Sequence, residues 1–323
     1  MDKEKRTDEI SPAAAVVGST GGGKSALALA ICERHGGELV SVDSMQVYRT
    51  MDIGTAKPTR EEQARVRHHM IDVCAPDTPY SAADYAPAAL AAAGEITARG
   101  NLPIFCGGTG LYLKALMDGL SLGGAGGDER LRAELNALAD EPGGKERLHA
   151  RLAAVDPETA ARLHPNDRRR VIRALEVYEQ TGVPMSRQNH AAQDRPFRVL
   201  PLVLEWPREL LYARLETRVH RMMEMGLLSE VRALLESGVA PATQSMQGIG
   251  YKELIPVVMG QGDVDRAVWD IIVHTRHYAK RQGTWFRAEP RCVWLDARDS
   301  DALFDRAMEH VQAFWNDAKE QDE

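Results

Sequence analysis

The order of apolar and polar positions predicts that the first 120 residues form a parallel α/β core. Apolar runs at 13–17, 39–42 and 102–110 have the length of buried strands. Between them lie stretches with helical spacing, such as SALALAICERH after the first run and the Ala-rich segment 85–99. Apolar strands that alternate with helices favour a parallel sheet covered by helices on both faces.

A change of pattern after residue 122 predicts a second, helical domain. The segment 123–127 is rich in glycine, and 131–181 carries apolar residues at helical spacing with almost no strand signal. The run at 195–206 restores a strand pattern, and the segments 207–237 and 264–286 are again mainly helical. The predicted organisation is a core of residues 11–122 and 195–318, a helical insertion at 123–194, and disordered tails at 1–10 and 319–323.

Composition argues against several classes of protein. With 323 residues, 44% of them hydrophobic, the chain is long enough for a large α/β domain and an appended piece. No apolar stretch approaches the ~20 residues needed to span a bilayer, and the N-terminus is charged where a signal peptide would be apolar. A cytoplasmic enzyme without a membrane partner is expected. The absence of a CxxC pair argues against a disulfide framework and a zinc site. The four cysteines are Cys32, Cys74, Cys106 and Cys292.

The formal net charge of −7 at first counts against a nucleic-acid partner, but basic residues gather locally. Phosphate contacts depend on such clusters more than on the total charge. On charge alone, a basic run is usually a solvated helix face, so a nucleic-acid surface and a solvated face both remain open. The basic residues are Arg168, Arg169, Arg170 and Arg173 in one cluster and Arg276, Lys280, Arg281 and Arg287 in the other.

The segment GSTGGGKS has the context of a phosphate-binding loop, because it follows an apolar run and precedes a helical stretch. In such a loop, glycines let successive backbone N–H groups point inward at a helix N-terminus. Lys24 supplies a cation, and the Ser25 hydroxyl is a ligand for Mg²⁺. The predicted pyrophosphate or nucleotide site consists of Gly18, Ser19, Thr20, Gly21, Gly22, Gly23, Lys24 and Ser25.

Asp43 is the main candidate for a residue that faces the reactant. Enzymes that bind ATP or GTP in such a loop usually place an Asp at the end of a second apolar strand, but the run 102–110 ends in glycines and Thr109. Asp43 instead follows the run 39–42, at the strand end where open α/β sheets gather ligands. The alternative on local sequence is a turn or capping Asp before Ser44.

Further segments resemble, in order, those of the tRNA dimethylallyltransferases, also called tRNA isopentenyltransferases. This family usually has Pro and Ser in its phosphate loop where this chain has Ser19 and Gly22, a departure that affects loop geometry only. The segments are DSMQVYRTMDIGTAKP at 43–58, HHMID at 68–72, YSAADY at 80–85, GGTGLYLKAL at 107–116, HPNDRRRVIRALEVYEQTG at 164–182, RMMEMGLLSEV at 221–231, QGIGYKE at 247–253 and TRHYAKRQGTWFR at 275–287.

The resemblance implies a P-loop NTPase-like fold and a monomeric, Mg²⁺-dependent prenyltransferase. The implied reaction moves a dimethylallyl group from dimethylallyl pyrophosphate to N6 of the adenosine 3′ of the anticodon, in tRNAs that read codons beginning with U. The insertion would grip the anticodon stem-loop. The implied catalytic residues are Asp43, Thr109, Lys24 and Arg218. The implied tRNA contacts are Asp43, Ser44, Met45, Gln46, Thr109, Arg132, Arg169, Arg170, Val171, Ile172, Arg173, Gln247, Gly248, Ile249, Gly250, Tyr251 and Lys252.

The residues fit this chemistry, although two other functions stay open. Asp43 would accept the proton of the attacking amine, and Gln46 is expected to hold a flipped base by its amide. One alternative is a P-loop kinase or an adenylate isopentenyltransferase with a small acceptor, which the insertion argues against. The other is a nucleotide-gated RNA-binding module, which would tolerate Asp43→Asn.

Overall fold

The chain folds into two compact units, which a computed structural model describes for residues 11–119, 128–188 and 197–321. One unit comprises Met1–Met117 and Arg195–Glu323, and the other comprises Asp118–Asp194. The first unit contains every strand of the described residues. The predicted parallel α/β core with helices on the sheet is confirmed.

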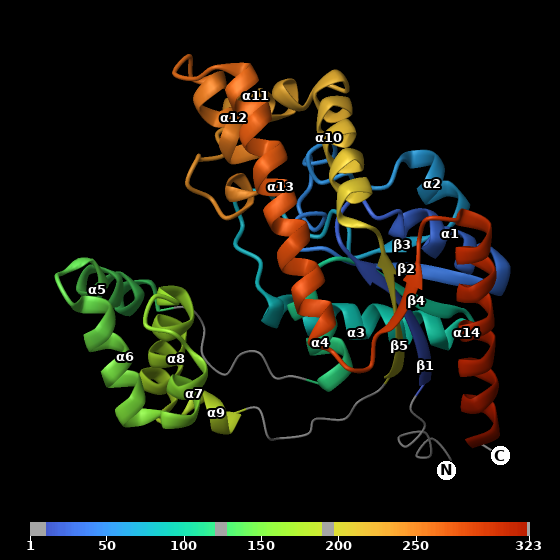
Figure 1. Cartoon of the computed structure of the whole chain (residues 1–323), viewed down its shortest axis with the longest axis horizontal. Coiled ribbons are helices and arrows are strands. Elements are labelled where there is room, and N and C mark those ends of the chain that lie inside the picture. The colour runs from blue at the N-terminus through green and yellow to red at the C-terminus, as the bar shows by residue number, and fades with distance from the viewer. Residues whose placement is uncertain (1–10, 120–127, 189–196, 322–323) are drawn as a thin grey trace, which may run out of the picture. The chain divides into compact units, whose positions relative to one another are not determined.

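The core unit is built on a six-stranded sheet with the order β3-β2-β4-β1-β5-β6, in which all strand pairs are parallel (Figure 1). The carboxyl ends of β2, β4 and β1 therefore lie next to one another at one edge, where their loops can form a common site. The strands are β1 (Ser11–Gly18), β2 (Gly37–Val42), β3 (His68–His69), β4 (Leu102–Gly107), β5 (Phe197–Glu205) and β6 (Val293–Asp296).

Side chains of β1 alternate between two apolar cores, one on each face of the sheet. Ala13, Ala15 and Val17 pack in the core shared with α3 (Ala82–Ala98) and α4 (Gly110–Asp118). Ala14 and Val16 pack in the core shared with α1 (Lys24–His35) and α14 (Ser300–Gln321). Small residues on the central strand let helices approach both faces closely, as strand periodicity requires.

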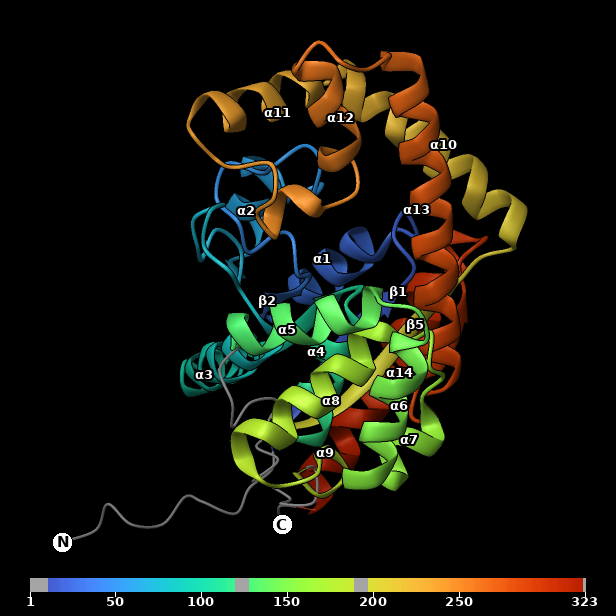
Figure 2. The same ribbon diagram turned by 90° about the vertical axis from the view of Figure 1, so that its left-hand side faces the viewer.

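A third apolar core joins the C-terminal helices to the loop after β2. Val47, Tyr48 and Met51 are fully buried there against side chains of α10, α11, α12 and α13. Figure 2 shows α11 and α12 lying over this loop. The elements involved are α10 (Arg208–Glu224), α11 (Leu227–Glu236), η1 (Ser245–Gln247), α12 (Tyr251–Val258) and α13 (Val264–Arg287). The short helix α2 (Arg60–Arg65) follows the same loop and buries none of its residues.

The second unit is helical throughout its described residues and has its own core. Leu135, Leu148, Leu152 and Leu175 lie in this core. A buried carboxylate, Glu176, is fully covered in the same unit. The helices are α5 (Glu129–Asp140), α6 (Gly144–Val155), α7 (Pro157–Arg162), α8 (Arg168–Thr181) and α9 (Met185–Gln188).

The structure differs from the sequence-based expectations at the ends and edges of the core. The strands β3 and β6 were not expected, and α14 continues to Gln321, so residues 319–321 are helical instead of part of a disordered tail. The expected tail at 1–10 and the glycine-rich crossing at 123–127 lie outside the described residues. None of the helices in the described part of the chain is long and apolar enough to cross a membrane.

Candidate active site

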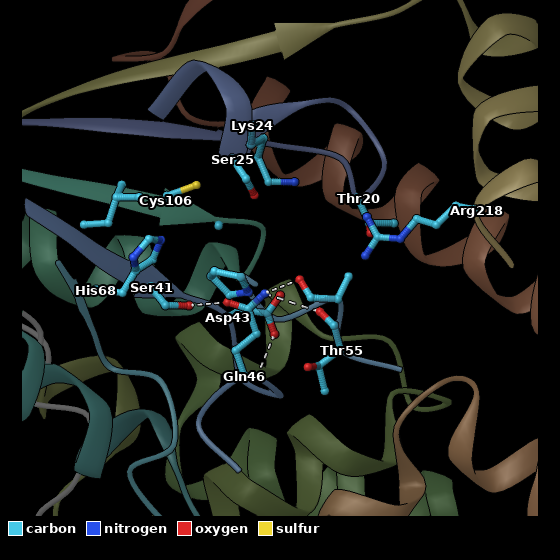
Figure 3. A pocket seen from close by; sticks show the side chains of 14 residues that line it. Thr20, Lys24, Ser25, Ser41, Asp43, Gln46, Thr55, His68, Cys106 and Arg218 are labelled. Carbon is cyan, nitrogen blue, oxygen red and sulfur yellow. Dashed lines mark hydrogen bonds between the residues drawn. The ribbon is translucent and has the colours of Figure 1, made fainter. Parts of the chain in front are cut away.

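The loops that follow β1 and β2, together with the last residues of β4, line one pocket at the carboxyl edge of the sheet (Figure 3). Thr20, Lys24 and Ser25 reach the pocket from the first loop, and Asp43 from the second. Figure 3 shows the Lys24 and Ser25 side chains on one side of the space and Asp43 with Gln46 on another. The sequence-predicted cradle and the predicted reactive carboxylate therefore share one site.

The phosphate-binding loop is held from outside by Trp206, which lies between β5 and α10, and by the backbone of α13. Gly23, which precedes α1, has the left-handed φ of 87°, as the tight curl requires. The Trp206 indole donates to the Gly22 carbonyl at 2.9 Å, and the Ser19 hydroxyl donates to the Ala279 carbonyl at 3.1 Å. Ser19 and Gly22, the departures from the family pattern, thus have defined partners in this chain.

Gln282 of α13 connects the phosphate loop to the loop after β4, although no local sequence motif indicates this role. Its amide oxygen accepts from the Thr20 N–H at 2.8 Å, and its amide nitrogen donates to the Gly108 carbonyl at 2.9 Å. The side chain is only 5% exposed. A Cβ at residue 108 would overlap this amide, so glycine is required at that position.

Lys24 is a half-buried cation whose charge the pocket destabilises. Burial lowers the pKa of its amine to about 8; Arg218 adds to the shift, while Cys106 and Asp43 oppose it. The ammonium donates to the Ser19 carbonyl at 2.8 Å, so it is folded back on its own loop. An anion placed in the loop would supply the missing compensation for this charge.

Cys106 lies beside this cation as a neutral thiol. Burial raises its pKa to about 11, and Lys24 and Ser25 only partly oppose the shift. A thiol with a raised pKa is unreactive.

Asp43 combines a turn role with a position in the pocket. Its Oδ1 accepts from the Met45 N–H at 2.8 Å and from the Gln46 N–H at 3.4 Å, which is the capping pattern considered as an alternative. These bonds fix the carboxylate's orientation, and the residue nevertheless lines the pocket. The turn is therefore what aims Asp43, and the two interpretations are compatible.

Thr109 supports the Asp43 loop from β4. Its hydroxyl oxygen accepts from the Ser44 N–H at 3.1 Å, next to Asp43. Burial raises the pKa of Tyr278, and hydrogen bonds to Thr109 and Gln282 are among the opposing influences. Thr109 therefore lies beside the Asp43 loop but is not among the residues that line the pocket, and its expected catalytic role remains a prediction.

Both the oxygen and the nitrogen of the Gln46 amide, which was expected to hold a base, are hydrogen-bonded within the protein. Its oxygen accepts from the Ser41 hydroxyl at 2.8 Å, and its nitrogen donates to the carbonyls of Thr55 at 3.3 Å and Ala56 at 3.1 Å. Because both amide hydrogens are used, Gln46 cannot donate to a ligand without releasing the loop at 52–58. Its role in this structure is to position that loop.

Arg218 and His68 complete the polar lining of the pocket. Arg218 extends from α10 and is half-buried; burial lowers its pKa, and Asp43 opposes the shift. His68 belongs to the HHMID segment, but no role was derived for it. Its Nδ1 lies 2.7 Å from the Val66 carbonyl oxygen, and burial lowers its pKa, which favours a neutral ring with Nε2 unprotonated.

Comparison with known proteins identifies the chain's relatives. A family model described as IPP transferase matches residues 46–289. The chain belongs to the IPP transferase family. It is 48% identical over 302 residues to tRNA dimethylallyltransferase 2 of Geotalea uraniireducens (strain Rf4), covering 93% of this chain and 96% of that one. It is 46% identical over 318 residues to tRNA dimethylallyltransferase of Geobacter metallireducens, covering 98% of this chain and 100% of that one.

Solved structures of IPP transferase relatives share the fold. The full-length tRNA isopentenylpyrophosphate transferase of Bacillus halodurans has 38% identity and a TM-score of 0.72, with 96% of this chain and 99% of that chain covered. A eukaryotic dimethylallyltransferase, described as acting on tRNA, has 28% identity and a TM-score of 0.77, with 96% and 80% covered.

The remaining predicted tRNA contacts of this IPP transferase differ in accessibility. In the helical unit, Arg169 and Arg170 are exposed. Arg132 and Arg173 form ion pairs with the buried Glu176, at 2.8 Å and 3.0 Å. The expectation that Val171 and Ile172 contact tRNA is wrong for their side chains, which are 1% and 4% exposed.

The segment 247–252 lies in the core unit and packs against the Asp43 loop. A Cβ at Gly248 would come within 2.5 Å of the Met45 methyl group. Tyr251 is buried, and its hydroxyl donates to Glu230 at 2.6 Å, so this ring cannot contact RNA directly. The other positions of this segment, which remain predicted contacts, are Gln247, Gly248, Ile249, Gly250 and Lys252.

Proposed function

We propose that this chain transfers a dimethylallyl group from dimethylallyl pyrophosphate to N6 of the adenosine 3′ of the anticodon in tRNA. The observation that carries the proposal is the shared pocket, in which a phosphate-binding loop and the Asp43 carboxylate line the same space. Relatives named tRNA dimethylallyltransferase support the same reaction. The acceptor tRNAs would be those that read codons beginning with U.

The phosphate loop would bind the pyrophosphate of the donor. Its backbone N–H groups, with the Lys24 ammonium and the Arg218 guanidinium, place positive charge where the carbon–oxygen bond breaks. Charge preorganised in a protected site stabilises a leaving anion far more than the same charge in water. Lys24 gains most from the donor, because its ammonium donates to a neutral carbonyl, that of Ser19, and burial destabilises its charge.

The donor set of the pocket fits Mg²⁺ held jointly with the donor's phosphates. The Ser25 hydroxyl supplies an oxygen atom beside the loop, and no group of at least three His, Cys, Asp or Glu residues in the described ranges could hold a metal by itself. Magnesium usually keeps several waters and is bound through few protein oxygens and substrate phosphates. When bound, the ion would neutralise part of the pyrophosphate charge.

Asp43 would act as the base toward the acceptor. As N6 attacks the allylic carbon, a nitrogen–carbon bond forms, the carbon–oxygen bond breaks, and pyrophosphate leaves with the bonding electrons. The amine then carries an extra proton, which Asp43 accepts. A general base must lie within hydrogen-bond reach of the proton, and the Met45 and Gln46 N–H groups hold the carboxylate in a fixed orientation for this.

The tRNA would be gripped by the helical unit through exposed arginines such as Arg169 and Arg170. The target adenosine must leave its stack before N6 reaches Asp43, and extrusion costs only a few kcal/mol in a loop that is already unpaired. The finer assignments, a monomeric enzyme in the cytoplasm and the individual tRNA contacts, belong to this proposal.

Labelled donor tests the proposal directly. The purified chain is given dimethylallyl pyrophosphate labelled in the prenyl group, ATP, Mg²⁺ and unmodified tRNA, and the labelled nucleoside is mapped. Label at the adenosine 3′ of the anticodon is expected. Consumption of ATP without prenyl transfer would contradict the proposal and favour a kinase or a nucleotide-gated RNA-binding module. Label on free adenine nucleotides would favour a small acceptor.

A further inference from the structure

A carboxylate from α11 closes a cluster of backbone N–H groups in the loop that follows Met51. Glu230 Oε2 accepts from the N–H groups of Asp52 at 2.9 Å and Ile53 at 2.8 Å. Its Oε1 accepts from the Gly54 N–H at 3.1 Å. Converging backbone N–H groups form an anion site, and here the protein fills that site with its own carboxylate.

Tyr251 fixes the carboxylate from the opposite side. Its hydroxyl donates to Glu230 Oε1 at 2.6 Å, and its ring is 1% exposed. A Cβ at residue 54 would come within 2.5 Å of the Tyr251 ring, so the loop can lie against the ring only with glycine there. We name Glu230, Tyr251 and the N–H groups of residues 52–54 the Glu230 latch.

The latched loop leads directly to the candidate base. The carbonyls of Thr55 and Ala56 accept from the Gln46 amide, and the Gln46 N–H donates to Asp43. Thr55 and Ala56 also line the pocket. Hydrogen bonds joined by short stretches of covalent chain therefore connect Glu230 on α11 to the Asp43 carboxylate.

The loop is held in a conformation that it would not adopt freely. Thr50 and Ala56 have left-handed φ angles of 63° and 47°. Such angles are unfavourable for non-glycine residues and persist only where the surroundings fix them. Charge-assisted bonds to Glu230 supply such a restraint.

We propose that Glu230 is a positioning residue for prenyl transfer, because its latch sets the 52–56 loop and, through Gln46, the orientation of Asp43. This inference rests on the proposed function and adds a residue of α11 to its machinery. Glu230 does not line the pocket and touches no reacting group.

A second anchor keeps the loop folded when the latch is removed. Lys57 donates to the Tyr48 carbonyl at 2.8 Å and pairs with Asp52 at 2.5 Å and Asp72 at 2.6 Å. Its side chain is 3% exposed. Loss of Glu230 should therefore loosen residues 52–54 locally without unfolding the core.

The test compares Glu230→Ala, Glu230→Gln and Tyr251→Phe with a control, Glu236→Gln, at the exposed end of the same helix. Hydrogen exchange of a peptide covering residues 50–57 reports the latch, and prenyl transfer into tRNA reports the reaction. We expect exchange to accelerate at 52–54 and kcat to fall about tenfold to a hundredfold in Glu230→Ala. The donor KM should stay near the wild-type value, because the phosphate loop has its own anchors.

The series has an expected order. Glu230→Gln retains one acceptor oxygen but presents an amide NH₂ group to a backbone donor. Its kcat and its hydrogen exchange at 52–54 should therefore lie between those of wild type and Glu230→Ala. Tyr251→Phe keeps the ring and loses one hydrogen bond, so its effect should be the smallest of the three. Glu236→Gln should match wild type in both readouts.

Several results would overturn the inference. A wild-type kcat in Glu230→Ala would contradict it, whether or not hydrogen exchange at 52–54 accelerates. Hydrogen exchange that accelerates in β1 and β4 as much as at 52–54 would also contradict it, because the loss would then be global. A donor KM raised in proportion to the loss of kcat would also do so. If the wild-type chain transfers no label to tRNA, the proposed function fails instead, and exchange at 52–54 still decides whether Glu230 holds the loop.

Discussion

At the scale of single residues, the pocket is organised by charges that compensate one another incompletely. Lys24 and Arg218 are both half-buried beside one carboxylate, Asp43, and desolvation lowers the pKa of both cations. A site with excess buried positive charge is ready for a multiply charged anion. This imbalance is the electrostatic reason to place the pyrophosphate in the loop.

The lowered pKa of Lys24 predicts a pH-dependent affinity for pyrophosphate. The ammonium, which binds the anion, is fully present below about pH 8 and is lost as pH rises through that value. The dissociation constant of pyrophosphate should therefore increase by up to about tenfold for each pH unit above this pKa. Isothermal titration calorimetry from pH 6.5 to 9.5 measures this dissociation constant, with only the buffer and its pH changed between experiments.

Lys24→Ala is the matched control for this titration. It removes the amine while leaving the ionisation of pyrophosphate itself unchanged, so the ratio of the two dissociation constants isolates Lys24. A ratio that stays constant across the series would contradict the assignment of this pKa to anion binding.

At the scale of elements, close contacts between loops and helices fix the pocket. The glycines of GGTG are sites of contact, since a Cβ at Gly107 would overlap the Val42 carbonyl and one at Gly110 would overlap the Trp285 ring. Gly108 plays the same role for Gln282. These contacts join β4 to β2 and to α13.

Gly108→Ala and Gly94→Ala form a pair of predictions about these contacts. Gly108→Ala should displace Gln282, separate the phosphate loop from the β4 loop and lower kcat by at least about tenfold. Gly94 lies inside α3 with open space at its Cβ position, so Gly94→Ala should stabilise the fold by about 0.5 to 1 kcal/mol. Urea denaturation and steady-state kinetics measure both; equal kinetics in the two variants would contradict the role of Gln282.

Elements with a clear hydrophobic period could be predicted from the sequence. The strand patterns before the phosphate loop and at 195–206 both correspond to central strands, β1 and β5. The strand β3 has only His68 and His69 and no alternation, so it left no signal. Short edge strands depend on their neighbours more than on their own residues.

The site could be predicted where a local motif carries it and not where distant elements meet. The phosphate loop and Asp43 are local features that precede their partners in the chain. Gln282 lies on the long helix α13, where its sequence neighbours do not distinguish it from other polar residues. No local motif predicts that its amide accepts from the Thr20 N–H. The partners of the Gln46 amide, the carbonyls of Thr55 and Ala56, could not be predicted either, because they are set by a loop with a left-handed residue.

At the scale of the whole molecule, the chain divides its tasks between two units. The core unit contains the pocket, and the helical unit has an independent core and exposed arginines. In that unit, Arg132 and Arg173 stabilise the buried Glu176 charge, so they have a structural role whatever else they contact. Arg169 and Arg170 are the better candidates for phosphate contacts.

The double variant Arg169→Ala with Arg170→Ala tests the helical unit. We expect weaker tRNA binding, a smaller salt dependence of that affinity by about two counterions, and unchanged kcat at saturating tRNA. Filter binding at several salt concentrations measures this. The control is Arg162→Ala, an exposed arginine of α7. A lower kcat with unchanged tRNA affinity would contradict the assignment.

The most direct test of the account compares Asp43→Asn with the control Asp77→Asn under single-turnover conditions, with donor and tRNA saturating. Asn keeps the turn-forming oxygen but cannot accept the amine's proton, and Asp77 is an exposed carboxylate outside the pocket. We predict that Asp43→Asn slows prenyl transfer about a hundredfold to ten-thousandfold while tRNA and donor still bind, and that Asp77→Asn matches wild type. A wild-type transfer rate in Asp43→Asn would contradict the account.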